Sequence, residues 1–237
     1  ILSIDPNHFD TILLLSTLER NKNNLNESKN LLLKAIDIKP KNIIALNNIG
    51  AIYKEMDKID EAISFYKKSL QIDSNHVSSN YNLGLIYKKL KDNEKAKSFF
   101  KKTTEIQPNF AFAHFSLGNL LVEQKEYSEA KKYYQKAVEI RPDLISAQNN
   151  LGLVLRLLGE HKNAIICFKK ALSINPKHAG AHSNLARTLS ELGNFDSAID
   201  SYQQALNLEP NNLYLHYYLS ELKEDILDDK LIERRLG

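Results

Sequence analysis

The sequence has few of the residues on which several common kinds of site depend. Its single cysteine, Cys167, excludes an intramolecular disulfide and a zinc site built from cysteines. Tryptophan is absent, and methionine occurs once. No apolar run approaches the roughly 18 residues that a membrane-spanning helix needs. The chain starts at Ile1, inside a pattern described below, so we expect it to be a piece of a longer chain.

Motifs that mark enzymes and nucleotide sites are also missing. There is no GxGxxG, no GxxxxGK[ST], no HExxH and no GxSxG. His178 and His182 are four residues apart, a spacing that can hold a metal on a helix, but both recur with the period described below. We therefore expect no catalytic residues, no cofactor and no metal.

Composition and charge narrow the possible partners. Hydrophobic residues make up 43% of the 237 residues and charged residues 26%, the balance of a soluble folded protein. The net charge of +3 does not by itself indicate a nucleic-acid binder. We expect neither nucleic acid nor membrane as a partner. The lone cysteine makes a cytoplasmic location the default expectation.

What the sequence does have is a period of 34 residues. Glycine and alanine both recur at this spacing, and so does proline, with Ser74 in its one missing place. The three series are Gly50, Gly84, Gly118 and Gly152; Pro6, Pro40, Pro108, Pro142, Pro176 and Pro210; and Ala62, Ala96, Ala130, Ala164 and Ala198. A fixed period of this length indicates stacked structural repeats.

The period divides the chain into six full units between two partial ones. Residues 1–8 match the end of a unit, and residues 213–237 are a partial unit or a capping helix. The full units are 9–42, 43–76, 77–110, 111–144, 145–178 and 179–212. Repeat positions are counted from the first residue of each unit.

Each unit predicts two helices. Apolar or small residues dominate positions 3, 7, 10 and 14, and again positions 20, 24, 27 and 28, so each set lies on one helical face. Proline at position 32 ends the second helix. Asp60, Ser128 and Asp196 are the predicted N-caps of second helices. Glycine at position 8 costs about 1 kcal/mol in a helix, and we expect close approach of two helix backbones to offset that cost.

These features resemble the tetratricopeptide repeat (TPR). The matching residues of one unit are Leu83, Gly84, Tyr87, Ala96, Phe100 and Pro108. The likeness is good over residues 43–212 and weaker over 9–42, and residues 181–189 look like the repeats of O-linked N-acetylglucosamine transferase. The resemblance implies an all-α fold, an α-solenoid wound as a right-handed superhelix, whose first helices line a concave groove for a partner.

Position 6, on the expected groove wall, is rich in asparagine. It carries Leu14, Asn48, Asn82, Ser116, Asn150, Asn184 and Tyr218. An amide side chain offers two donors and an acceptor, so a row of them could hold the backbone of an extended peptide without reading its side chains. Alternatively, these asparagines are solvated or bond to neighbouring helices.

Aromatic and basic residues complete the candidate groove. The aromatic ones, at positions 2 and 5, are Tyr81, Phe112 and Phe115. Exposed rings would anchor a partner, whereas rings packed between repeats would belong to the core. The basic ones, at position 12, are Lys54, Lys88 and Arg156. They would favour an acidic partner, or they would simply be exposed to water on a helical face.

Three functions are compatible with these patterns. The first is a non-enzymatic scaffold that binds a protein or peptide ligand in its groove. The second is the substrate-recognition arm of a larger glycosyl- or sulfotransferase. The third is a structural solenoid that associates with itself, either end to end or through its convex face.

Overall fold

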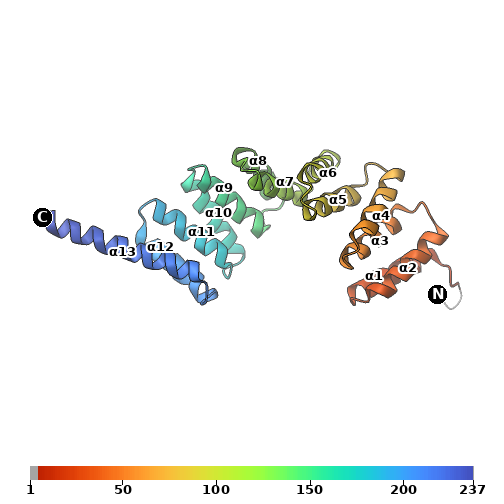
Figure 1. The fold of residues 1–237 in the computed structure, drawn as a ribbon, viewed down its shortest axis with the longest axis horizontal. Helices are drawn as coiled ribbons and strands as arrows, with labels where there is room; N and C mark the ends of the chain where they lie inside the picture. The colour runs from red at the N-terminus through yellow and green to blue at the C-terminus, as the bar shows by residue number, and fades with distance from the viewer. Residues whose placement is uncertain (1–4, 237) are drawn as a thin grey trace. The chain divides into compact units, whose positions relative to one another are not determined.

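The computed structural model describes residues 5–236, with side chains for residues 5–224. In this part of the chain there are thirteen α-helices and no strand (Figure 1). The helices form two compact units, Ile1–Ala113 and His114–Gly237. Within each unit, consecutive helices pack as antiparallel pairs, so the expected all-α helical-repeat fold is confirmed.

The helices follow the repeat. The first unit contains α1 (Phe9–Asn21), α2 (Leu25–Ile38), α3 (Ile43–Glu55), α4 (Ile59–Ile72), α5 (Val77–Lys89) and α6 (Asn93–Ile106). Helix α7 (Ala111–Glu123) spans the division between the units. The second unit continues with α8 (Tyr127–Ile140), α9 (Ile145–Leu157), α10 (His161–Ile174), α11 (Ala179–Glu191), α12 (Phe195–Leu208) and α13 (Leu213–Leu236). Among the described helices, none has both the length and the apolar character that crossing a membrane requires.

The second helices begin earlier than predicted. Asp60, Ser128 and Asp196 are not N-caps, because each is the second residue of its helix. The N-caps of α4, α8 and α12 are Lys58, Glu126 and Asn194. Asp60 and Asp196 lie in the first turn, where a negative charge interacts favourably with the helix dipole. The two acidic residues therefore correctly indicated where a helix begins, but they stabilise it through their charge and not as N-caps.

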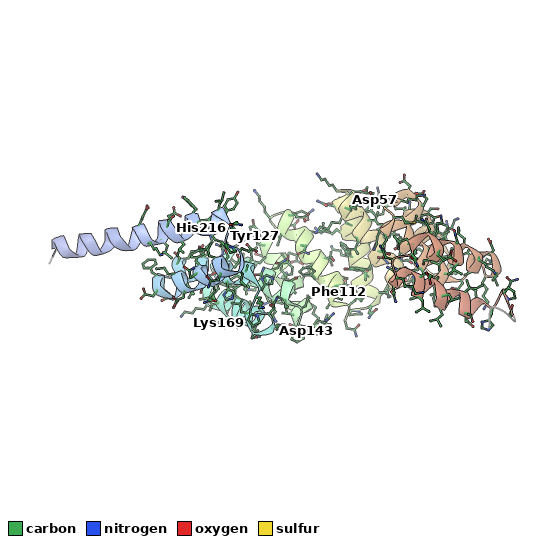
Figure 2. All side chains as sticks on the ribbon, turned by 90° about the horizontal axis from the view of Figure 1, so that it is seen from below. Asp57, Phe112, Tyr127, Asp143, Lys169 and His216 are labelled. Atoms are coloured by element: carbon green, nitrogen blue, oxygen red, sulfur yellow. The ribbon has the colours of Figure 1, made fainter. Side chains whose placement is uncertain are left out.

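The turn between the two helices of a repeat has a left-handed residue at position 15. Its φ angle lies between 58° at Asp57 and 77° at Gly159. The residues at this position are Asn23, Asp57, Lys91, Lys125, Gly159 and Gly193. Asp57 is labelled in Figure 2. Glycine adopts this conformation freely, and asparagine and aspartate tolerate it, but lysine does so at a cost. The turns at Lys91 and Lys125 are therefore strained.

The glycine at position 8 makes room for an aromatic ring. A Cβ atom added at Gly84 would lie 2.6 Å from the ring of Phe100, and one added at Gly152 would lie 2.6 Å from the ring of Phe168. Both rings are fully buried at position 24 of the same repeat. The expectation that two backbones approach each other here was wrong, because the ring occupies the space.

We predict that Gly152→Ala destabilises the protein. The added methyl group overlaps the ring of Phe168, which is fully enclosed, and overpacking of this kind costs about 1–3 kcal/mol. That loss equals or exceeds the gain in helix propensity of about 1 kcal/mol. Gly180→Ala is the matched control, because the nearest atom to its added Cβ is 3.4 Å away. Thermal and urea unfolding would measure both, and equal midpoints for the two variants would contradict this packing.

We also predict that Lys125→Gly stabilises the protein by about 1 kcal/mol, because glycine removes the steric cost of a left-handed residue. The reciprocal change, Gly159→Lys, should destabilise by a similar amount, since nothing lies within 4 Å of an added Cβ and only the backbone conformation is affected. The same unfolding measurements apply. A loss of stability in Lys125→Gly would show that the turn is not strained.

Candidate functional site

Asparagines at positions 5, 6 and 9 lie on one side of the first helices that carry them, and we call the set in each unit its asparagine face. Its members are Asn47, Asn48 and Asn82 in the first unit and Asn119, Asn149, Asn150 and Asn184 in the second. Those at position 6 are half-buried: their side chains are neither enclosed in the core nor fully solvated.

In the second unit the asparagines bond to one another across repeats. Asn150 Nδ2 donates to Asn119 Oδ1 at 3.0 Å, and Asn149 Nδ2 donates to Asn150 Oδ1 at 3.3 Å. Asn184 Nδ2 donates to Asn149 Oδ1 at 3.0 Å. The Tyr134 hydroxyl donates to Asn119 Oδ1 at 2.7 Å, and burial raises the pKa of Tyr134 to about 12, which keeps this hydroxyl protonated. The bonds therefore link three successive repeats and hold each amide in one orientation.

This network does not use every hydrogen-bonding atom of the asparagine face. Asn150 uses both its amide nitrogen and its oxygen. Asn184 Oδ1, in contrast, accepts no hydrogen bond from any described residue. Ser116, at position 6 of the same unit, is only 5% exposed and lies within the core. In the second unit, Asn184 is thus the position-6 asparagine that keeps an acceptor for a ligand.

In the first unit the spare groups are donors. Asn48 Oδ1 accepts from Asn47 Nδ2 at 3.5 Å, and Asn82 Oδ1 accepts from Lys54 Nζ at 2.9 Å. The Nδ2 groups of Asn48 and Asn82 donate to none of the described residues. The neighbouring bonds orient these two amides, so their N–H groups are presented without intramolecular competition.

The basic residues at position 12 are largely engaged within the chain. Lys54 bonds to Asn82, and burial lowers the pKa of Lys54. The Arg156 side chain is only 8% exposed, and its Nη1 donates to Glu191 Oε1 at 2.6 Å. Lys88 is half-buried. Arg156 thus holds two repeats together and does not offer an exposed charge to a partner.

The aromatic residues differ in exposure. Tyr81 is half-buried against Phe100 and Phe110, with ring centroids 5.7 and 5.0 Å away. Phe115 is half-buried against Tyr134 at 5.9 Å. Both rings therefore contribute mainly to the core of their units. Phe112, at 38% exposure, is the more accessible of the three predicted aromatic residues.

The recurring histidines have structural roles. His178 Nδ1 accepts from the backbone N–H of Ala181 at 3.0 Å and so caps α11. His182 Nε2, at position 4, lies 2.9 Å from the carbonyl oxygen of Pro176 in the linker between repeats. Gln148 donates to the equivalent carbonyl of Pro142 at 3.2 Å. Among the described residues, no group of histidine, cysteine and acidic side chains could hold a metal ion.

Sequence reasoning missed a hollow on the last repeat of the second unit. It measures about 170 Å³ and is lined by Arg187, Ser190, Glu191, Tyr202, Tyr218, Glu221 and Leu222. The Tyr218 ring stacks on Tyr202 at 6.3 Å, and the Arg187 guanidinium lies over it at 5.6 Å. Tyr218 holds position 6, where asparagine is usual, and that substitution was the available signal. The hollow offers an aromatic wall beside the asparagine face.

Comparisons with known proteins agree with this geometry. Tetratricopeptide repeat models match residues 9–42, 41–109, 111–144 and 143–209. The chain belongs to the tetratricopeptide repeat family. A comparison with curated proteins finds no match. The particular likeness of residues 181–189 to O-linked N-acetylglucosamine transferase receives no separate support.

Several solved structures resemble this TPR chain. MamA is 28% identical, with a TM-score of 0.64 over 70% of this chain and 97% of that chain. YrrB, described as a TPR protein with an unusual peptide-binding site, is 24% identical, with a TM-score of 0.70 over 79% and 96%. Pseudomonas aeruginosa pilF is 20% identical, with a TM-score of 0.80 over 90% and 97%. The last two likenesses show the fold alone.

We predict that Tyr134→Phe lowers the stability of this TPR array by about 1 kcal/mol, the usual net value of a lost hydrogen bond. Tyr66→Phe is the matched control. The Tyr66 hydroxyl is buried and has no hydrogen-bond partner among the described residues, because Ala51 holds the position that Asn119 holds beside Tyr134. Removing it should leave stability unchanged or higher. Equal losses in the two variants would contradict the assigned role of Asn119.

Proposed function

We propose that this chain is a non-enzymatic scaffold that binds an extended peptide or protein segment along the asparagine face of a unit. The observation that carries the proposal is the set of oriented but unused amide groups at position 6. These are Asn48 Nδ2 and Asn82 Nδ2 in the first unit and Asn184 Oδ1 in the second. Each is fixed by a bond that its other amide atom makes to a neighbouring side chain.

Such groups suit a peptide backbone. An extended peptide presents carbonyl oxygens and N–H groups, and the asparagine face offers donors for the former and an acceptor for the latter. Because the intramolecular bonds already orient the amides, binding costs little further side-chain entropy. Contacts of this kind do not depend on the ligand's side chains, so the face alone would confer affinity with little sequence preference.

Side chains next to the asparagine face would supply a preference for particular ligand sequences. Phe112 is exposed in the first unit, and Tyr214 and Tyr217 are exposed on α13 in the second. The hollow beside Tyr218 could admit one side chain of the ligand. Exposed aromatic residues are frequent anchors of binding interfaces. The peptide-binding site named for YrrB, which shares this fold, supports a peptide as the class of ligand.

A peptide array followed by fluorescence anisotropy on the retained peptides would test the proposal. Asn48→Ala/Asn82→Ala should weaken binding to the first unit about 30-fold, from two lost hydrogen bonds of about 1 kcal/mol each, and Asn184→Ala should weaken binding to the second unit about fivefold. Asn150 is left intact, because its removal would break the network that supports the fold. Asn30→Ala, on the exposed side of α2, is the matched control and should bind normally.

Circular dichroism should show that both variants keep their helical content and melting transition. Unchanged affinity in both folded variants would contradict the proposal. So would an array on which the wild-type chain retains no peptide at all.

A further inference from the structure

The second helices of the last two full repeats carry opposite charges. Helix α10 contains Lys162, Lys169 and Lys170 but no acidic residue, whereas α12 contains Asp196 and Asp200 but no lysine or arginine. The other second helices, α2, α4, α6 and α8, each carry both signs. The segregation is therefore particular to this neighbouring pair, which lies wholly within the second unit.

These charges lie on the outward side of their helices. All five side chains are exposed, whereas positions 20, 24 and 27 of both helices are buried against the first helices. Lys169 is labelled at the margin of this unit in Figure 2. Between the lysines lies Ile166, a 52% exposed apolar residue. None of the five charged groups forms an ion pair with another described residue.

The position of Lys162 is unfavourable for the isolated helix. It is the second residue of α10, where the positive end of the helix dipole repels a cation. Asp60, Glu94 and Asp196 hold the same repeat position in α4, α6 and α12, with the favourable sign. Lys169 and Lys170 add further positive charge on the same side. A negative surface facing α10 would offset this repulsion.

We propose that the outer faces of α10 and α12 form an interface between two copies of this chain. Both helices pack against α11, and as the second helices of successive repeats they run in the same direction, so a twofold axis parallel to them sets α10 of each copy against α12 of the other. Lys162 then faces the partner's Asp196 at repeat position 18, and Ile166 lies opposite the partner's Asp200 at position 22, about one helical turn from Lys169 and Lys170 at positions 25 and 26. A single face carrying both signs is self-complementary, which favours a second copy over an unrelated acidic partner.

The expected dimer is weak and sensitive to salt. Two helix faces bury less than the roughly 800 Å² per partner of a standard interface, and exposed charge pairs are screened over about 8 Å at physiological ionic strength. The asparagine face lies on the first helices and is not covered. A dimer would therefore present two copies of that face to a ligand.

Sedimentation equilibrium of the full chain over a concentration series would test this inference. The wild type should dimerise at about 20 mM salt and dissociate at about 500 mM. Lys169→Glu/Lys170→Glu and Asp196→Lys/Asp200→Lys should each weaken self-association at least tenfold, because each makes the two facing surfaces alike in sign. An equimolar mixture of the two variants should associate, since one surface is then acidic and the other basic.

Lys67→Glu/Lys68→Glu makes the same change at the equivalent positions of α4 and should dimerise like the wild type. Circular dichroism would establish that every variant is folded. A constant monomer mass for the wild type would overturn the inference, as would dimerisation that either charge reversal leaves unchanged. Failure of the mixture to associate would overturn it too. So would α10-dependent binding to phosphatidylserine vesicles or to poly-glutamate by a chain that stays monomeric.

Discussion

The contact between position 8 and the ring at position 24 sets how the two helices of a repeat meet. Where position 8 is glycine, the ring of Tyr or Phe fills the space that a side chain would take. The first repeat has a larger residue at position 8, Ser16, and a smaller one at position 24, Leu32, and both are buried. The volume at the contact is thus divided differently between positions 8 and 24, and the two helices remain packed. With this contact made, the position-6 asparagines Asn48, Asn82, Asn150 and Asn184 stay half-buried on the other side of the first helix.

That side serves both the fold and the proposed binding. In three repeats the residue at position 9 matches the ring beside it: Asn119 accepts from the Tyr134 hydroxyl, whereas Leu85 and Leu153 accompany Phe100 and Phe168. Once Asn119 is held in this way, it accepts from Asn150 as well. Asparagines that form hydrogen bonds through both the amide nitrogen and the amide oxygen stabilise the stack of repeats. Those that use only one of these two atoms keep the other for a ligand, so the same residue type has two roles.

The sequence was sufficient for the features that depend on periodic burial. The spacing of apolar positions predicted both helices of each repeat, and the position-24 rings are core residues as expected. The period could not show why glycine is needed at position 8, because a spacing does not identify the neighbouring atom. Position 15 was missed, although Gly159, Gly193, Asn23 and Asp57 are residue types that favour a left-handed conformation. Lys91 and Lys125 at that position obscured the pattern.

The candidate site was less predictable. Register alone identified the asparagines at position 6, but it did not show which of their atoms are already bonded. Arg156 was taken for an exposed cation at a groove rim, and only coordinates show it paired with Glu191 of the next repeat. Hydrogen-bond direction depends on side-chain rotamers and on partners 31 to 35 residues away. A repeat pattern does not specify either of these.

The central claim is that the spare amide groups of the asparagine face contact the backbone of a bound peptide. The most direct measurement is a ¹⁵N-labelled NMR titration that follows the side-chain NH₂ resonances as an array-selected peptide is added. The account predicts that the resonances of Asn48 and Asn82 shift with the peptide concentration, while that of Asn30 on the outer side stays in place. Saturation of binding with the Asn48 and Asn82 resonances unmoved would contradict it.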